Sequence, residues 1–223
     1  MPKLSIIKET KHWLAINKQA GLIVERNPFE TPTIETLVTE YLSQQYRNPY
    51  VGIAHRLDRV TSGVLLIAKK KSALRKLNEQ FRERSVQKIY FAIVENKPLQ
   101  EEAILVDWLL KDQKNKRAII YEKSVEGSGK VELKYRIVEQ LSAGYLLEVK
   151  PKTGKFHQIR VQLSNIGCPI LGDEKYGAQQ TYFNRAIALH AQQLSFNDPS
   201  TNERITLIAD FPKNNVWKNR LYG

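Results

Sequence analysis

The segment His55-Arg56-Leu57-Asp58-Arg59-Val60-Thr61-Ser62-Gly63 sets one carboxylate between two arginines, with apolar runs on either side at 51–54 and 64–68. Both runs are short enough to be buried strands, which places Asp58 near a strand end. Neighbouring cations keep such a carboxylate ionised at neutral pH. An ionised carboxylate can act as a nucleophile or base without a metal. The same residues are also compatible with an Asx turn followed by ordinary turn chemistry at 61–63.

A second polar segment, Thr153-Gly154-Lys155-Phe156-His157-Gln158-Ile159-Arg160-Val161-Gln162-Leu163, begins with a glycine turn and continues at helical spacing. Arg160 lies one turn from His157 along this predicted helix. These groups can form a binding site. They are equally compatible with an exposed arginine and a hydrogen-bonded histidine on an ordinary helix.

The remaining periodicity predicts an α+β fold. Thr31 and Pro32 look like the start of a helix that continues to residue 42, and Ser72 can cap a second helix with Leu74, Leu77 and Phe81 on its inner face. Apolar and alternating runs predict strands over 12–17, 22–25, 89–94, 131–137, 145–149 and 204–209, and helical spacing predicts a helix over 157–165. Because strands dominate and no regular βαβ alternation appears, we expect a mixed, mainly antiparallel sheet flanked by helices.

The charge of the chain indicates a polyanionic partner. Its 223 residues include 35 Lys and Arg against 23 Asp and Glu, a formal net charge of +12. Nucleic acid is the commonest polyanion that a basic protein binds, although a solvated basic surface is the alternative. The cations cluster in two stretches: Lys69, Lys70, Lys71, Arg75, Lys76, Arg82, Arg84 and Lys88, and then Lys111, Lys114, Lys116 and Arg117.

Several classes of protein are disfavoured. No apolar run reaches the ~20 residues that span a bilayer, so no membrane partner is expected. The single cysteine, Cys168, permits no internal disulfide and is expected to be a small packed residue of a cytoplasmic protein. The four histidines are scattered, and nucleotide-binding, CxxC and HExxH patterns are absent. We therefore expect neither a metal nor a cofactor.

Taken together, the motifs resemble those of the RluA-type pseudouridine synthases, which isomerise uridine in RNA. Residues 55–69 are similar to the family's HRLDxxTSGxLLxAK signature, and residues 153–163 to TGRxHQIRxHL. Further matches follow the family's order: residues 16–22 to NKPAGL, 88–92 to KxYxA, 167–177 to GxPIxGDxxYG and 188–191 to ALHA. The resemblance covers nearly the whole chain.

The resemblance implies a fold, a mechanism and a set of roles. The fold would be a single catalytic domain over residues 1–223, with a central RNA-binding cleft and no separate N-terminal RNA-binding module. Asp58 would be the catalytic aspartate, Arg160 its pairing arginine and Tyr90 the ring that stacks on the target base. Arg56 would enter the space left by the flipped nucleotide. The other substrate-binding positions would be His55, Arg59, Thr61, Lys88, Lys155, His157, Gln158 and Leu163.

Three departures bear on substrate contacts more than on catalysis: Gln19 stands where the family has proline, Lys155 where it has arginine and Gln162 where it has histidine. We expect a monomer that binds ribosomal RNA, transfer RNA or both. Two alternatives stay open. One is a non-catalytic RNA-binding or chaperone protein on the same fold, and the other is an RNA hydrolase that uses His55 and His157 as acid and base.

Overall fold

The computed structural model describes residues 4–217, which form eleven strands, three α-helices and one 3-10 helix. The chain divides into two compact units. Among the described residues, the first unit contains residues 4–88 and 191–217, and the second contains residues 89–190. The divisions fall within two strands, β5 (Gln87–Val94) and β10 (Leu189–Asn197).

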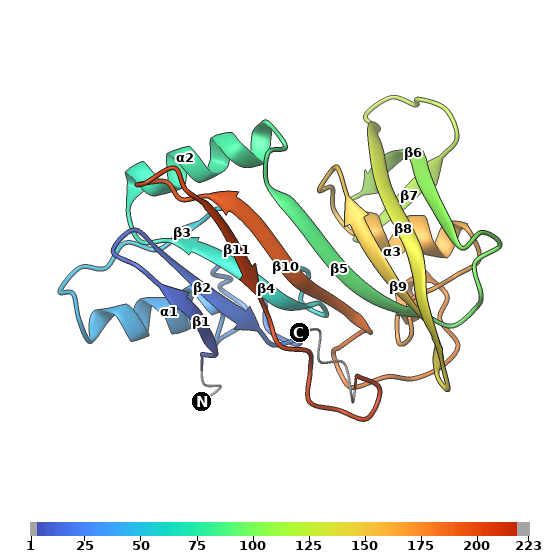
Figure 1. Cartoon of the computed structure of the whole chain (residues 1–223), viewed down its shortest axis with the longest axis horizontal. Coiled ribbons are helices and arrows are strands. Elements are labelled where there is room, and N and C mark those ends of the chain that lie inside the picture. The colour runs from blue at the N-terminus through green and yellow to red at the C-terminus, as the bar shows by residue number, and fades with distance from the viewer. Residues whose placement is uncertain (1–3, 218–223) are drawn as a thin grey trace. The chain divides into compact units, whose positions relative to one another are not determined.

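The first unit is built on strands in the order β1-β2-β4-β10, labelled in Figure 1. These are β1 (Ile6–Glu9), β2 (Trp13–Lys18), β4 (Ser62–Ala68) and β10, with the short β3 (Gly52–Ile53) on β4 and β11 (Arg204–Ile208) on β10. The pairings β1–β2, β2–β4, β3–β4 and β10–β11 are all antiparallel. Every residue of β4 is buried, as expected for the apolar run that follows Asp58.

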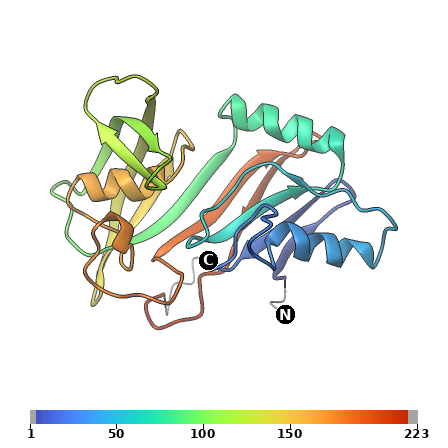
Figure 2. The same ribbon diagram turned by 180° about the vertical axis from the view of Figure 1, so that it is seen from behind.

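Two helices complete the first unit. Helix α2 (Lys71–Arg82) buries Ala73 and Leu77 against Trp13, Leu66 and Phe196 and turns its basic residues outward. The rings of Trp13 and Phe196 meet edge to face, with centroids 5.3 Å apart. Helix α1 (Ile34–Ser43) buries Ile34, Leu37, Val38 and Leu42. Both helices are seen from behind in Figure 2.

The second unit is an antiparallel sheet in the order β5-β9-β8-β6-β7. Its other strands are β6 (Glu102–Asp112), β7 (Arg117–Tyr121), β8 (Gly129–Leu141) and β9 (Gly144–Pro151). Helix α3 (Gln158–Asn165) lies against β6 and β7, as Figure 2 shows, and the 3-10 helix η1 (Glu174–Tyr176) follows it. The core beneath α3 contains Leu109, Ala118, Val131, Val161 and Tyr176.

The predicted α+β class is confirmed. Some predicted boundaries and elements of the first unit are wrong, and two strands of the second unit were not predicted. Helix α1 begins two residues later than predicted, with Thr33 as N-cap, where Thr33 and Thr36 form a reciprocal capping box. The predicted strand over 22–25 does not form, because Ile23 and Val24 use their carbonyls to accept the first N–H groups of α1. Ser72 does not cap α2, whose N-cap is Lys70. Strands β6 and β7 were not predicted.

Candidate active site

The loop that carries Asp58 connects β3 to β4 and is fastened at several points within the first unit. Leu57 is buried and anchors the loop beside Asp58, which itself is half-buried. The Asp58 carbonyl accepts the N–H of Thr61 at 3.0 Å, and the Arg59 carbonyl accepts the N–H of Gly21 at 2.8 Å. This loop therefore holds its carboxylate on a backbone with little freedom.

Gly63 lies where the Asp58 loop joins β4, and the backbone there requires a glycine. Its φ of +119° lies in the region that favours glycine, and an added Cβ would meet the Ala191 carbonyl oxygen at 2.2 Å. A residue with a side chain would both strain the backbone and push β4 from β10. The glycine of the sequence motif thus serves close strand packing directly after the Asp58 loop.

Lys18 is a buried lysine beside the Asp58 loop, and the sequence alone gave it no role in the site. It ends β2, is 1% exposed and donates hydrogen bonds to the carbonyls of Gln19, Arg59 and Thr61 at 3.0, 3.2 and 2.8 Å. Burial lowers the pKa of Lys18 to about 7, and the charge of Asp58 acts in the opposite direction. The available signal was a single lysine at the end of an apolar strand, within the segment that resembles NKPAGL.

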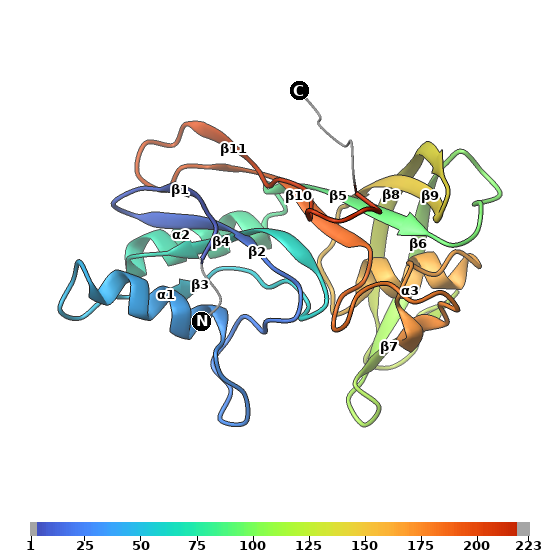
Figure 3. The same cartoon turned by 90° about the horizontal axis from the view of Figure 1, so that it is seen from below.

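The two arginines beside Asp58 in the sequence have glutamate partners in the structure. Arg56 pairs with Glu25 at 2.8 Å, and Arg59 pairs with Glu30. Both glutamates lie in the segment between β2 and α1, which projects as a loop in Figure 3. The two arginines that flank Asp58 in the sequence are thus each held by a glutamate of another segment, and a further cation, Lys18, lies close enough for the charge of Asp58 to act on its pKa.

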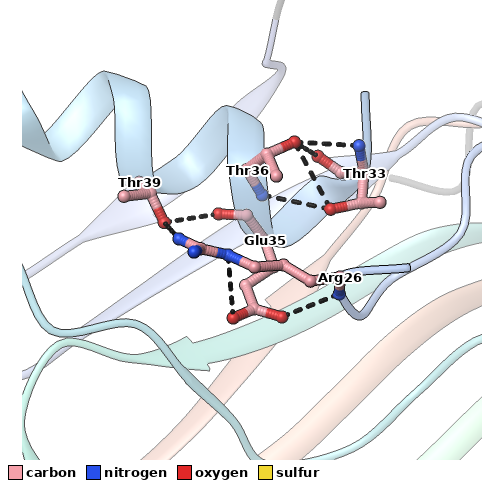
Figure 4. A network of polar contacts seen from close by, with 5 residues as sticks. All are labelled: Arg26, Thr33, Glu35, Thr36 and Thr39. Carbon is pink, nitrogen blue, oxygen red and sulfur yellow. Dashed lines mark hydrogen bonds and ion pairs between the residues drawn. The ribbon is translucent and has the colours of Figure 1, made fainter. Parts of the chain in front are cut away.

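Helix α1 holds this glutamate-bearing segment in place (Figure 4). The backbone N–H of Arg26 donates to Glu35 at 2.9 Å, and its guanidinium reaches Glu35 at 3.4 Å and Thr39 at 3.2 Å. Thr39 in turn donates to the Glu35 carbonyl at 2.7 Å. The network sets the positions from which Glu25 and Glu30 meet the arginines.

His55 has a structural role in the first unit. Its Nε2 accepts the N–H of Leu66 at 3.0 Å, and its ring stacks on Phe81 with centroids 5.0 Å apart. Burial, aided by the charge of Lys88, lowers the pKa of His55 to about 3. The imidazole is therefore neutral and joins the loop to β4 and α2. Lys88 is half-buried, and burial also lowers its pKa.

In the second unit, Arg160 is held by an acidic partner. It is 5% exposed, and its Nε and Nη2 donate to the two carboxylate oxygens of Asp173 at 2.7 Å each. The guanidinium also lies over the Tyr176 ring, 5.0 Å from its centroid. Such a fork-shaped pairing fixes the plane of the guanidinium. Asp173 belongs to the segment that matches GxPIxGDxxYG. The sequence alone did not assign a role to this aspartate.

His157 is also built into the fold. It is the N-cap of α3 with a φ of +52°, and its ring stacks on Phe156 with centroids 3.7 Å apart. The Tyr176 hydroxyl accepts the N–H of Ala118 at 2.7 Å and forms a second hydrogen bond with His157 Nδ1, 2.8 Å away. Burial, followed by the charge of Arg160, lowers the pKa of His157 to about 3. This histidine is neutral at physiological pH.

The departure at Gln162 has a structural explanation. The Thr153 hydroxyl donates to Gln158 Oε1 at 2.8 Å, and Gln158 Nε2 donates to Gln162 Oε1 at 3.0 Å. Gln162 Nε2 then donates to Asp107 on β6 at 2.6 Å. An amide both accepts and donates, so Gln162 continues the chain of hydrogen bonds from the Thr153 turn through α3 to the sheet.

Several predicted substrate-binding side chains lie in the interior. Leu163 is 0% exposed and Gln158 is 3% exposed, so their placement supports a structural role. Lys155, in contrast, is exposed, and Tyr90 on β5 is half-buried opposite Val149. Cys168 is buried and burial raises its thiol pKa, in agreement with a packed residue. The prediction that Arg160 pairs with Asp58 joins residues of different units and stays a prediction.

The described residues, 4–217, contain no candidate metal centre. No group of three or more His, Cys, Asp and Glu side chains is arranged there to hold a metal ion. In the same part of the chain, no helix has the length and apolar character that crossing a membrane requires.

Two features are available to define the class of protein. One is the loop that carries Asp58 and ends at Gly63, and the other is the helix whose Arg160 pairs with Asp173. Comparison with known families identifies this class. The chain belongs to the RNA pseudouridylate synthase family, whose model matches residues 12–165. Over 212 residues it is 37% identical to a relative from Vibrio parahaemolyticus called ribosomal large subunit pseudouridine synthase C. That match covers 92% of this chain and 64% of the relative, so the chain spans about two thirds of that protein's length.

Two further similarities agree with this assignment. A Yersinia pestis protein called tRNA pseudouridine synthase C is 34% identical over 229 residues, covering 92% of this chain and 86% of the relative. The solved structure of human RNA pseudouridylate synthase domain containing 4 superposes with a TM-score of 0.78 at 25% identity, covering 94% of this chain and 89% of that one. The fold predicted from the sequence is thus the fold of this family.

Proposed function

We propose that the protein is a pseudouridine synthase that converts specific uridines in structured RNA to pseudouridine, with Asp58 as the catalytic residue. The observation that carries the proposal is the placement of Asp58. It is the carboxylate of a family-matched loop that Lys18, Leu57 and Gly63 hold rigidly. Rigid placement of a charged group is what electrostatic stabilisation of a transition state requires.

The proposed reaction is an internal rearrangement. The bond between uracil N1 and ribose C1′ breaks, its electron pair leaves with the uracil, and positive charge develops at C1′. The Asp58 carboxylate stabilises this charge, either as an ion pair or by bonding to C1′. The uracil turns, C5 bonds to C1′, the C5 proton is lost and N1 gains a proton. Substrate and product are isomers, so the scheme consumes no co-reactant.

The other residues receive roles that suit their placement. We assign Tyr90 to stacking on the extruded base, worth ~1–3 kcal/mol per base, and to removal of the C5 proton. Arg160, already oriented by Asp173, is assigned to the Asp58 carboxylate. Arg56 has an exposed side chain and is assigned to the space that the flipped nucleotide leaves, at the expense of its pair with Glu25. Because these residues come from both units, we treat 1–223 as one catalytic domain.

RNA binding is proposed to depend on the basic surface of the first unit. Lys71 and Arg75 are exposed on α2 and border an open hollow of about 720 Å³. Lys69 belongs to the cation cluster that suggested a polyanionic partner, but it is not available to phosphates, because its side chain is 6% exposed and paired with Glu9 at 2.5 Å. Arg59, Lys88 and Lys155 remain proposed RNA contacts. Thr61 is 2% exposed, so like Gln158 and Leu163 it does not fit a direct RNA contact, and its buried hydroxyl has no hydrogen-bond partner among the described residues.

The relatives' names suggest the RNA. The Vibrio relative is named for the large ribosomal subunit and the Yersinia relative for tRNA. We therefore propose ribosomal RNA as the first substrate class and transfer RNA as the second, modified in the cytoplasm by a monomer. Mapping pseudouridine across total RNA from cells with and without the protein distinguishes the two classes.

The hydrolase alternative loses support from the site. Acid–base hydrolysis by His55 and His157 needs one protonated imidazole near neutral pH, whereas the pKa of each is lowered to about 3. The alternative of a non-catalytic RNA-binding protein makes a different prediction: substitution of Asp58 would leave every property of the protein unchanged.

The test is Asp58→Asn, measured by release of tritium from RNA labelled at uridine C5. Asparagine has nearly the same shape but no charge, so the barrier should rise by at least ~5 kcal/mol, roughly four orders of magnitude in rate. RNA affinity should survive, because phosphate contacts do not need this carboxylate. A thermal melt shows that the variant is folded. Folded Asp58→Asn protein that keeps more than about a hundredth of the normal rate would refute the mechanism.

A further inference from the structure

A second, smaller pocket lies in the first unit, away from the Asp58 loop. It has a volume of about 220 Å³ and is bordered by the segment after α1 and by the junction of β4 with α2. Two tyrosines, Tyr46 and Tyr50, and three lysines, Lys11, Lys69 and Lys70, contribute to its lining. Among the described residues, no carboxylate lines it.

The aromatic wall of this pocket is held in position. A Cβ added to Gly52 would come within 2.9 Å of Cε1 of Tyr50, so the glycine makes room for the tyrosine ring. The Lys69 ammonium lies 5.3 Å from the centroid of the Tyr46 ring. Tyr46 itself is 45% exposed, so the pocket is open to solvent on the side of this tyrosine. One ring is thus fixed by packing and the other presents a face to solvent.

The positive charge is partly fixed as well. Lys69 donates to Glu9 at 2.5 Å and to the Thr10 carbonyl at 2.9 Å, while the Tyr41 hydroxyl donates to the same glutamate at 2.8 Å. This arrangement holds the Lys69 ammonium beside the Tyr46 ring. Lys11 and Lys70, within the described part of the chain, have no acidic partner. Their charges stay uncompensated at the rim.

We infer that this pocket binds one unstacked nucleotide of the RNA, with its base against the tyrosines and its phosphates at Lys11 and Lys70. Aromatic faces stack on bases of any identity, and lysines at the rim complement the flanking phosphates. A pocket of this size admits a single base and excludes a duplex, in which bases are not accessible for stacking. The ligand class is therefore a single-stranded segment of the substrate.

The position of the pocket makes it a contact separate from catalysis. Strand β4 joins the two sites, since the Asp58 loop precedes Ser62 and the pocket begins at Lys69 after Ala68. Seven residues at ~3.3 Å each put them roughly 23 Å apart along the strand, which is about seven base-pair rises of 3.4 Å. The inference rests on the proposed function for the identity of the ligand, and it predicts that the bound nucleotide flanks the modified one at a distance.

The first experiment tests binding without relying on turnover. A short single-stranded RNA carrying 5-bromouridine is the probe, with affinity read by fluorescence anisotropy and contacts read by photocrosslinking. Tyr46→Ala should weaken binding by about 5- to 150-fold, the equivalent of one base stack, whereas Tyr46→Phe should bind normally. Crosslinks should map to Tyr46 or Tyr50. The matched control is Phe183→Ala, which removes another exposed ring.

The salt dependence tests the lysines. Replacing Lys11 and Lys70 together with alanine should reduce the slope of log affinity against log salt by about 1.4, at ~0.7 for each phosphate that is no longer neutralised. If Tyr46→Ala and the double lysine variant both bind the probe as the wild type does, or if crosslinks map elsewhere, the inference is overturned. An equally large reduction in binding to duplex RNA would also overturn it.

Turnover measurements separate this inference from the proposed function. On a long substrate, Tyr46→Ala should raise KM and leave kcat unchanged, and on a minimal hairpin it should behave as the wild type does. If the protein makes no pseudouridine but Tyr46 still governs binding of the probe, the proposed function fails and the pocket assignment stands. If pseudouridine forms and Tyr46 has no effect on either substrate, only the pocket assignment fails.

Discussion

Lys18→Met tests whether the buried ammonium positions the catalytic loop. Methionine keeps the unbranched apolar stem but donates no hydrogen bonds. The Arg59 carbonyl keeps a donor, because Gly21 N–H also bonds to it at 2.8 Å. The carbonyls of Gln19 and Thr61 lose the donor that Lys18 supplies at 3.0 and 2.8 Å.

The magnitude follows from these two carbonyls. A buried group left without its partner costs about 1–3 kcal/mol, so the pair costs roughly 2–6 kcal/mol in the free energy of unfolding. Removing a buried ammonium offsets part of this cost, since its desolvation opposes folding. We therefore expect a loss near the lower end, about 2 kcal/mol. A displacement of the loop by about 1 Å would lower kcat by about 100-fold.

The assay compares turnover with stability. Tritium release at saturating RNA gives kcat, and denaturant unfolding gives the free energy of unfolding. The matched control is Leu77→Ala, a change in the core of the same unit that should cost about 2–5 kcal/mol and leave kcat normal below its melting temperature. Normal kcat for folded Lys18→Met protein would refute a positioning role, and an equal reduction of kcat in both variants would show only a general effect of instability.

The pH dependence of stability gives an independent reading of Lys18. Burial lowers its pKa in the folded protein from 10.5 to about 7, so the unfolded chain binds more protons between those values. The cost of burying the ammonium is present below pH 7 and is relieved as the pH rises toward 10.5. In this window Lys18 should make stability rise by up to ~1.4 kcal/mol per pH unit, and Lys18→Met should lack that contribution.

Three further substitutions probe other parts of the site. Arg160→Lys should lose most turnover with RNA binding kept, because an ammonium cannot hold Asp173 through two parallel bonds; near-normal turnover would exclude Arg160 as the residue that acts on Asp58. Tyr90→Phe should be nearly active and Tyr90→Leu poor if stacking is the whole role, whereas equal failure in a tritium-release assay would assign proton removal to the hydroxyl. Gly63→Ala should destabilise the protein by more than about 1 kcal/mol in denaturant unfolding, given its φ of +119° and the 2.2 Å approach to the Ala191 oxygen, and unchanged stability would contradict this view of the loop.

Local sequence signals were strongest where a residue's own neighbours determine its conformation. Alternation over 131–137 predicted β8, because one face of that strand is buried and the other is solvated. The apolar run at 64–68 predicted β4 for a different reason, because that strand is buried on both faces. Strand β6 escaped prediction although its residues also alternate between exposed and half-buried positions, because apolar Ile104 and Val106 occupy the exposed face.

The limits of sequence reasoning appear where burial and partners depend on distant residues. Arg56 and Arg59 flank Asp58 in the chain, but their ion pairs are with Glu25 and Glu30, about thirty positions away. Burial lowers the pKa values of His55 and His157 to about 3, so neither imidazole carries a proton for acid catalysis at neutral pH. The residues next to these histidines in the sequence do not reveal this burial. A charge pattern along the chain therefore does not specify a charge pattern in space.

By itself, the sequence determined the fold class and the family and predicted which carboxylate is reactive, because periodicity and motif order are properties of the chain that survive without coordinates. Only the tertiary structure decided that Lys18 fastens the Asp58 loop, that Asp173 orients Arg160 and that Leu163 is internal. The physical reason is that desolvation and hydrogen-bond geometry arise from groups brought together from distant strands and helices. Asp58 could be named from its neighbours, but the groups that hold its loop in place could be found only in three dimensions.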